Sequence, residues 1–333
     1  RHFEGTALRL NHGVRDCRVL ECRFLDTGAS GVVLWKEVVD CTVAGCEFAR
    51  NGDTCLKVFD YLGEGPAMSG GHRIVNNHFH HGGTVRRHMA AIGVSGSEGC
   101  RIAHNLIHHM PYNGIDLTGA RAEYWSAKAV PELEPPYTAA KIKPHVRTRK
   151  NVIEHNHIHH VMRELHDGGA IYCWGTMGEG TNRVRNNLIH HVGQGERISV
   201  GIYLDDACDD VVVEDNVVVG ARIGQHLHGA PRNRIQNNFF TYCTRSDIAI
   251  QPEEYNLAPM GTEVVRNIFA WGKGKVFDTG EGWNKNWDRK PIRAMKHNLY
   301  WRGGEQIELG TGHLKGFDSQ SDVARPAFDP ARA

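Results

Sequence analysis

Four aspartates have surroundings that could support acid–base chemistry. Asp167 lies in "HDGGAIYCWG", Asp205 and Asp206 close "GIYLDD", and Asp116 lies in "GIDL". Cleavage of a glycosidic bond commonly uses two carboxyl groups, one protonated as the acid and one ionised as the base or nucleophile. The residue types therefore predict carbohydrate chemistry, provided that the fold brings two of these carboxyls together.

Strand alternation indicates which neighbours would share a surface with them. In "GIYLDD" the apolar Ile202 and Leu204 should point inward, which leaves Tyr203 and Asp205 pointing outward. Equivalent outward positions carry Asp116, Tyr172 and His226 and, one row over, Trp174, His228 and Gln251. Aromatic rings, carboxylates and imidazoles suit the ring faces and hydroxyls of sugars. We predict catalytic Asp167 and Asp205, with substrate bound by Asp116, Tyr172, Trp174, Tyr203, Asp206, His226 and His228.

A repeat predicts how these side chains are positioned. Short apolar segments recur around the anchor residues Cys22, Cys46, Asn77, Asn105, Asn156, Asn187, Asn216, Asn238, Asn267 and Asn298. Their separations are 24, 31, 28, 51, 31, 29, 22, 29 and 31 residues, a period typical of solenoids, propellers and arrays. Short β-branched runs broken by Gly and Asn disfavour helical repeats. We predict an all-β fold, a right-handed parallel β-helix of about ten coils, as a single domain over residues 1–333.

Stacking of the coils would explain the anchor residues. Asn at a tight turn can adopt the left-handed conformation and hydrogen-bond to the Asn of the next coil. A small buried Cys can take the same place in the first coils. The nine cysteines are accordingly interpreted as small buried hydrophobes rather than as disulfide partners or zinc ligands.

Four His–His pairs follow the anchors, in "NHFHH", "NLIHH", "NHIHH" and a second "NLIHH". Each pair lies three and four residues after its anchor, so stacked coils would form two columns of imidazoles. Imidazoles at that spacing cannot all be charged, and most should be neutral. The pattern favours a structural stack over a metal array, because metal ligands converge on one point.

Composition limits the possible partners. The 333 residues include 39 Lys+Arg and 38 Asp+Glu, a balance that argues against a nucleic-acid-binding or membrane-surface protein. No apolar run approaches the length of a membrane span. The chain opens in "RHFEGTALRL", which already resembles a strand, so we expect a mature or trimmed fragment without a visible signal peptide.

Long segments between repeats predict loops around a groove. Residues 118–150 form an insertion in which Tyr124, Trp125 and Tyr137 could either stack on a sugar or anchor the loop. Residues 252–261 and 278–291 are similar excursions, the latter with Trp283 and Trp287. Residues 302–333 are expected to form a C-terminal tail or cap.

The catalytic pair raises a difficulty of spacing. Asp167 and Asp205 are 38 residues apart, whereas the local coil step is 31, so the two are not in register. Only a sharp bend at Gly168–Gly169 would bring Asp167 over the groove beside Asp205.

The stretch from "NVIEHNHIHHVMRELHDGGAIY" through "GIYLDDACDDVVVEDNVV" to "NRIQNNFF" resembles the parallel β-helix proteins of glycoside hydrolase family 141. The resemblance covers about residues 72 to 270 and is tightest over 151–240. That family includes α-L-fucosidases and xylanases with two proposed catalytic aspartates. The resemblance implies that Asp167 and one of Asp205 or Asp206 are the pair.

Two other functions fit the same fold. A polysaccharide lyase would eliminate across a uronate, with Tyr203 and His226 as acid and base. A non-catalytic carbohydrate-binding solenoid would need no paired acids. No cofactor or metal is expected, although calcium could bind the acidic "DDACDD" cluster, whose simpler interpretation is one functional Asp followed by a polar turn. A polysaccharide or oligosaccharide substrate implies secretion, to the periplasm or the outer surface, and the sequence leaves the oligomeric state open.

Overall fold

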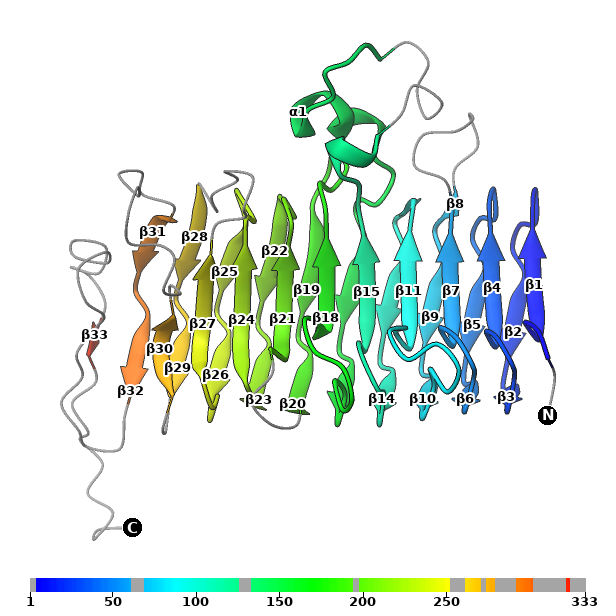
Figure 1. Ribbon diagram of the computed structural model, residues 1–333, viewed down its shortest axis with the longest axis horizontal. Helices are drawn as coiled ribbons and strands as arrows, with labels where there is room; N and C mark the ends of the chain where they lie inside the picture. Colours follow the sequence, from blue (N-terminus) through cyan, green and yellow to red (C-terminus); the bar gives the residue numbers. More distant parts are fainter. Residues whose placement is uncertain are drawn as a thin grey trace, which may run out of the picture.

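Each sequence repeat forms one coil of short strands, and the coils stack into three long parallel sheets (Figure 1). The computed structural model describes residues 4–60, 69–125, 133–193, 198–251, 261–270, 274–278, 292–301 and 322–323. The chain visits the three sheets in turn before rising to the next coil. Parallel crossovers in one sheet are right-handed as a rule. The fold is the predicted right-handed parallel β-helix.

Sheet 1 consists of β1 (Leu8–Asn11), β4 (Val32–Trp35), β7 (Leu56–Phe59), β11 (Ile92–Ser95), β15 (Ile115–Thr118), β18 (Gly169–Trp174), β21 (Val200–Asp205), β24 (Ile223–His228), β27 (Ser246–Gln251) and β30 (Lys275–Asp278). Sheet 2 consists of β2 (Arg18–Leu20), β5 (Thr42–Ala44), β9 (Arg73–Val75), β13 (Arg101–Ala103), β16 (Val152–Glu154), β19 (Asn182–Arg185), β22 (Val211–Glu214), β25 (Arg234–Gln236), β28 (Thr262–Val265) and β31 (Ile292–Lys296).

Sheet 3 consists of β3 (Arg23–Leu25), β6 (Glu47–Ala49), β10 (His78–His80), β14 (Leu106–His108), β17 (His157–His159), β20 (Leu188–Val192), β23 (Val217–Ala221), β26 (Phe239–Thr241), β29 (Ile268–Ala270), β32 (Leu299–Trp301) and β33 (Asp322–Val323). Two further short strands, β8 (Ser69–Gly70) and β12 (Ser97–Glu98), pair with each other.

Identical or similar apolar side chains stack along the interior. Phe24, Phe48 and Phe79 form one ring stack, with centroids 5.0 and 4.6 Å apart. Phe240 and Phe269 begin another, at 5.5 Å. Such columns bury apolar surface without gaps because every coil presents the same side of each strand to the core.

The anchor residues form the predicted ladder. Asn156 donates its backbone N–H to Asn187 Oδ1 at 3.0 Å and its side-chain N–H to the Ile102 carbonyl at 3.0 Å. Cys46 takes the same place earlier in the chain, where its N–H donates to Asn77 Oδ1 at 2.9 Å. The buried amides are thus satisfied from coil to coil.

One detail of the ladder prediction is wrong. The left-handed residue is not the anchor but the residue before it, as at His155 (φ 53°) and Asn186 (φ 53°). The turn is made there, which leaves the anchor free to direct both its N–H and its side chain at the neighbouring coils. Seven of the nine cysteines are buried as predicted, whereas Cys22 is exposed and Cys17 is half-buried.

The insertion at 118–150 follows β15 and projects from the end of sheet 1 (Figure 1). It carries the short helices η1 (Ala122–Tyr124), α1 (Ala139–Ile142) and η2 (Lys143–His145). Trp125, Ile142 and Val146 form a small core of their own. The insertion is therefore packed structure, and Trp125 anchors it.

Several predicted features lie outside the described residues. These are positions 252–260 and 279–291, with Trp283 and Trp287, and most of the 302–333 tail, of which β33 alone is described. Within the described part of the chain, no helix has the length and apolar character needed to cross a membrane.

Candidate active site

Sheet 1 presents the two predicted rows of side chains. Strand register aligns Asp116 with Tyr172, Tyr172 with Tyr203, and Tyr203 with His226. In the second row Trp174 is paired with Asp205, and His228 with Gln251. The alternation within "GIYLDD" therefore placed these positions correctly.

Asp205 is a buried carboxylate held by two donors. The Tyr172 hydroxyl donates to Oδ2 at 2.7 Å, and His228 Nδ1 lies 2.7 Å from Oδ1. Because an ionised carboxylate only accepts hydrogen bonds, His228 must carry its proton on Nδ1 in this contact. These two contacts fix the orientation of the Asp205 carboxyl.

Asp206 is held differently from Asp205. Its Oδ2 accepts from Trp174 Nε1 at 2.8 Å and from Arg121 Nη1 at 2.8 Å. Asp206 and Ala207 both adopt left-handed conformations, with φ of 43° and 67°, which turn the chain at the end of β21. Asp206 therefore holds the Trp174 ring and, through Arg121, the insertion by hydrogen bonds. The charge of Asp206 is already balanced by Arg121.

Asp167 reaches the site through the predicted bend. It has φ 62°, and its N–H donates to the Ile198 carbonyl at 2.8 Å. A Cβ at Gly168 would lie 2.2 Å from Asn113 Oδ1, so the turn requires glycine there. Tyr203 donates its hydroxyl to Asp167 Oδ1 at 3.4 Å. The bend thus brings Asp167 into the electrostatic field of Asp205 despite their different register.

The acidity of Asp167 is shifted toward the protonated form. Partial desolvation and the negative charge of Asp205 raise the pKa of this carboxyl above its ordinary value. Asp205, by contrast, has two donors facing its oxygens. The two carboxyls therefore lie in unequal surroundings.

Asp116 lies beside the pair rather than in it. Its Oδ1 accepts from Asn113 Nδ2 at 2.7 Å, while Asn113 Oδ1 accepts from the Gly169 N–H at 2.9 Å. Burial raises the pKa of Asp116 to about 7. Asn113 thus connects Asp116 to the bend that carries Asp167.

Tyr203 and His226 lie beneath the site. They are 3% and 2% exposed, and their rings stack at 4.5 Å. Burial lowers the pKa of His226 to about 3, so its imidazole is neutral. Their burial favours a supporting role over the predicted direct contact with substrate.

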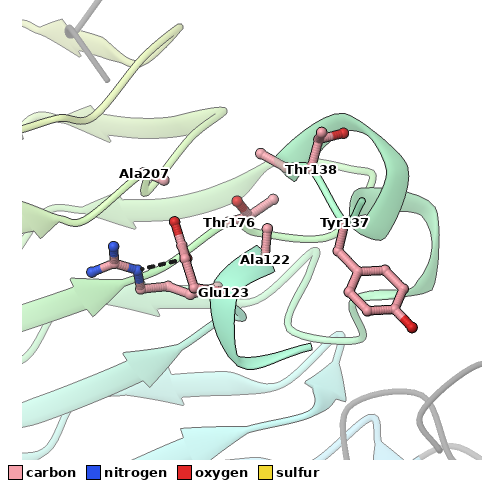
Figure 2. Close-up of a pocket in the computed structure, with 8 residues that line it drawn as sticks. Ala122, Glu123, Tyr137, Thr138, Thr176 and Ala207 are labelled. Atoms are coloured by element: carbon pink, nitrogen blue, oxygen red, sulfur yellow. Dashed lines mark hydrogen bonds and ion pairs between the residues drawn. The ribbon is translucent and has the colours of Figure 1, made fainter. Parts of the chain in front are cut away.

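The insertion adds a cavity next to Asp206, shown in Figure 2. Its volume is about 160 Å³, and it is lined by Arg121, Ala122, Glu123, Tyr137, Thr138, Ala139, Thr176 and Ala207. Arg121 joins the cavity to the site, because it pairs with both Glu123 and Asp206. Tyr124 is 75% exposed and lies 6.3 Å from the Trp174 ring, with the planes 18° apart. Of the three aromatic residues named in the insertion, Trp125 is buried, Tyr137 is half-buried and lines the cavity, and Tyr124 is the most exposed.

Sequence reasoning missed Arg121, Tyr112 and Asn113. Tyr112 donates its hydroxyl to the Asp167 carbonyl at 2.6 Å. Tyr112 and Asn113 precede the strand "GIDL" and occupy no outward strand position, so alternation could not find them. Arg121 lies inside the insertion, where no repeat predicts its direction.

In the described part of the chain, Asp205, Asp206 and His228 are also a group of three potential metal ligands whose atoms converge. Tyr172 occupies one oxygen of Asp205, and Trp174 with Arg121 occupies one oxygen of Asp206. An ion would have to replace the contact between His228 and Asp205. Further along "DDACDD", Asp209 pairs with Lys143 at 2.9 Å and with Arg232, which supports the interpretation of a polar turn.

No protein-family model and no curated protein matches the chain. Three solved structures show a similar arrangement of the chain. A protein described as "Glycoside hydrolase" is 19% identical with a TM-score of 0.47, over 63% of this chain and 34% of that one. XylC in complex with xylose is 12% identical with a TM-score of 0.47, over 81% and 42%. The catalytic domain of a GH87 alpha-1,3-glucanase in complex with nigerose is 10% identical with a TM-score of 0.45, over 96% and 48%.

The chain spans less than half the length of each of these three structures. None of the three is named as a member of family 141, so that membership stays a prediction. The residues of the site itself indicate the function.

Proposed function

We propose that this protein is a glycoside hydrolase, with Asp167 as the general acid and Asp205 as the base or nucleophile. The observation that carries the proposal is the unequal environment of the two carboxyls. Asp205 receives hydrogen bonds from Tyr172 and His228, whereas the pKa of Asp167 is raised. Glycosidic cleavage needs this combination of an ionised and a protonated carboxyl.

The charges around the site favour a neutral sugar. Asp205, Asp206 and Glu123 supply negative charge, against Arg121 and His228. Arg121 is already paired with two carboxylates. A uronate would add negative charge to this surface, where the described residues offer mainly carboxyls, so a neutral glycan is the better substrate.

The same features disfavour a lyase. The acid and base expected for elimination, Tyr203 and His226, are buried below the surface. Burial also raises the pKa of Tyr203 far above its usual range. Neither side chain can readily reach a uronate proton, and the hydrolase remains the function that the site supports best.

Family 141 supplies a finer hypothesis, namely an α-L-fucosidase-like or xylanase-like activity on a plant or microbial polysaccharide. Such a substrate lies outside the cell, so we further propose that the protein is exported. Fractionation of cells that produce the protein from its own gene would test this, and retention in the cytoplasm would contradict it.

A panel of polysaccharides tests the activity. Reducing ends and unsaturated uronate absorbance are followed in parallel for the parent, Asp167→Asn and Asp205→Asn. Asp215→Asn is the control, because Asp215 is an exposed aspartate in a left-handed turn (φ 56°), which asparagine also adopts. We expect reducing ends without absorbance, lost in the two site variants and retained in the control.

Other results would contradict the proposal. Uronate absorbance would mean elimination. Binding of a glycan without any cleavage would mean a carbohydrate-binding solenoid. Equal activity in Asp205→Asn and the parent would remove Asp205 from the mechanism.

A further inference from the structure

Sheet 3 carries a surface array of imidazoles away from the aspartates of sheet 1. We name it the histidine array: an inner column of His80, His108, His159 and His190 and an outer column of His81, His109, His160 and His191. Along the outer column, ring centroids are 5.0, 5.0 and 4.8 Å apart. The coil repeat therefore sets the spacing of the array.

Within each coil the inner and outer rings face each other through one nitrogen. The Nδ1–Nδ1 distances, from the first pair to the last, are 2.9, 2.7, 2.8 and 2.6 Å. Two nitrogens bound at right angles on Cu²⁺ or Ni²⁺, each at about 2.0–2.1 Å, would lie about 2.9 Å apart. Each pair thus has the separation of two neighbouring metal ligands.

We propose that the histidine array binds divalent transition-metal ions such as Ni²⁺ or Cu²⁺, each between the Nδ1 atoms of one inner–outer pair. Binding requires both Nδ1 atoms to be without protons. Each neutral imidazole meets this by carrying its single proton on Nε2, so no ring changes its charge.

The second nitrogen of several inner rings already has a partner for that proton. His108 Nε2 lies 2.8 Å from His78 Nε2, and His190 Nε2 lies 2.7 Å from His157 Nε2. His80 Nε2 lies 3.3 Å from Glu47 Oε1. Metal-ligating histidines usually donate their other N–H to such an acceptor, which fixes the tautomer and orients the ring.

Charge repulsion limits how many pairs can fill. Ions on adjacent coils would lie about 5 Å apart, so we expect about two ions per chain rather than one on every pair. Arg163 acts electrostatically on His81, His109 and His160, and Arg50 acts on His80 and His81, so positive charge opposes binding at the first three pairs. Neither arginine acts on His190, so the His190–His191 pair should fill first.

The test is titration of the intact protein with NiCl₂, followed by calorimetry at pH 7.5 and pH 6.0. The test variant is His81→Asn, His109→Asn, His160→Asn and His191→Asn together, which removes the outer column. These positions are left-handed (φ 55°, 53°, 51° and 53°), a conformation that asparagine tolerates. The control is His104→Asn with His155→Asn, two left-handed histidines (φ 57° and 53°) whose rings stack at 5.0 Å on another part of the coil.

We expect saturable binding of about two Ni²⁺ ions in the parent and the control, weaker at pH 6.0 because protons compete with the metal for the imidazole nitrogens, and none in the outer-column variant. Circular dichroism verifies that the variant is folded. If it is not, His160→Asn with His191→Asn replaces it and should reduce the number of ions bound. No saturable binding by the parent, or equal binding by the variant, would overturn the proposal and leave a purely hydrogen-bonded stack.

Discussion

Sheets 1 and 3 present polar side chains to solvent in opposite ways. On sheet 3 the same residue recurs on successive coils, as in His81, His109, His160 and His191. On sheet 1 most neighbouring coils contribute different residues, and Tyr172 and His228 both contact Asp205. Stacked imidazoles on sheet 3 disfavour one another's charged form. Unlike neighbours on sheet 1 instead place hydrogen-bond donors around a carboxyl.

A division of roles between chemical groups requires neighbouring coils that differ, and sheet 1 is the face on which they differ. A coil that repeats its neighbour can contribute stability but no division of roles between groups. A coil that departs from its neighbour, as at the Asp167 bend, supplies a carboxyl in a distinct environment. Each of the following variants breaks or sharpens this contrast.

Asp167→Asn should have the largest effect. Loss of the acid is expected to lower kcat on a polysaccharide by about 100- to 10,000-fold, as for other general acids. The parent's rate should fall as pH rises through the raised pKa of Asp167, because the acid must be protonated. This alkaline limb should vanish in the variant.

Aryl glycosides with good leaving groups provide the matched measurement, since their departure needs little protonation. The variant should recover most of its rate on them. Equal losses on both kinds of substrate would show that Asp167 is not the acid.

Asn156→Ala should break the regular side of the comparison. The change leaves the Asn105 N–H and the Ile102 carbonyl without their partner, both in the buried ladder. We expect the free energy of unfolding to fall by about 3 kcal/mol, measured by urea denaturation. The adjacent His155→Asn, in an exposed left-handed turn, is the control and should be nearly neutral. Similar stability in both variants would mean that the ladder contributes little.

Tyr172→Phe should show whether Tyr172 supports Asp205 or binds substrate. It removes one donor from Asp205 and no apolar contact. A hydrogen bond to a charged group contributes about 1.5–3 kcal/mol, so kcat should fall by at least about tenfold. Tyr242→Phe, at a site 66% exposed, is the control. A change in KM alone would instead assign Tyr172 to substrate binding.

Regular and irregular parts of the sequence were predictable to different degrees. The repeat located the coils, the anchors and both histidine columns, because each depends on residues recurring at a fixed spacing. Alternation placed Tyr172 and Asp205 in their rows for the same reason. These features follow from local geometry that every coil shares.

The remaining features depend on departures from the repeat. Arg121 reaches Asp206 from an insertion 85 residues earlier, and no periodicity specifies that contact. The burial of Tyr203 and His226 depends on how neighbouring rings cover them, which strand alternation does not describe. The bend at Gly168 was identified as a requirement, but only the packing against Asn113 determines its direction.

The smallest expected effect concerns acid and the histidine array. Protonation of the array should lower the free energy of unfolding as pH falls. The pKa values of His108, His159 and His190 are lowered to about 3, 4 and 4, against about 6.5 when unfolded. Below pH 6.5 the unfolded chain therefore binds more protons, and stability falls as pH decreases toward 4. Partial exposure of the rings reduces the contribution, to about 1 kcal/mol between pH 7 and pH 5. Replacing His108, His159 and His190 with glutamine should remove the part of the pH dependence that these rings contribute to the free energy of unfolding. Unfolding curves of parent and variant at several pH values measure it, and His104→Asn with His155→Asn should keep the pH dependence of the parent. An unchanged slope would show that the array is protonated in the folded protein, and stacking of like residues would then not suppress charge on this face.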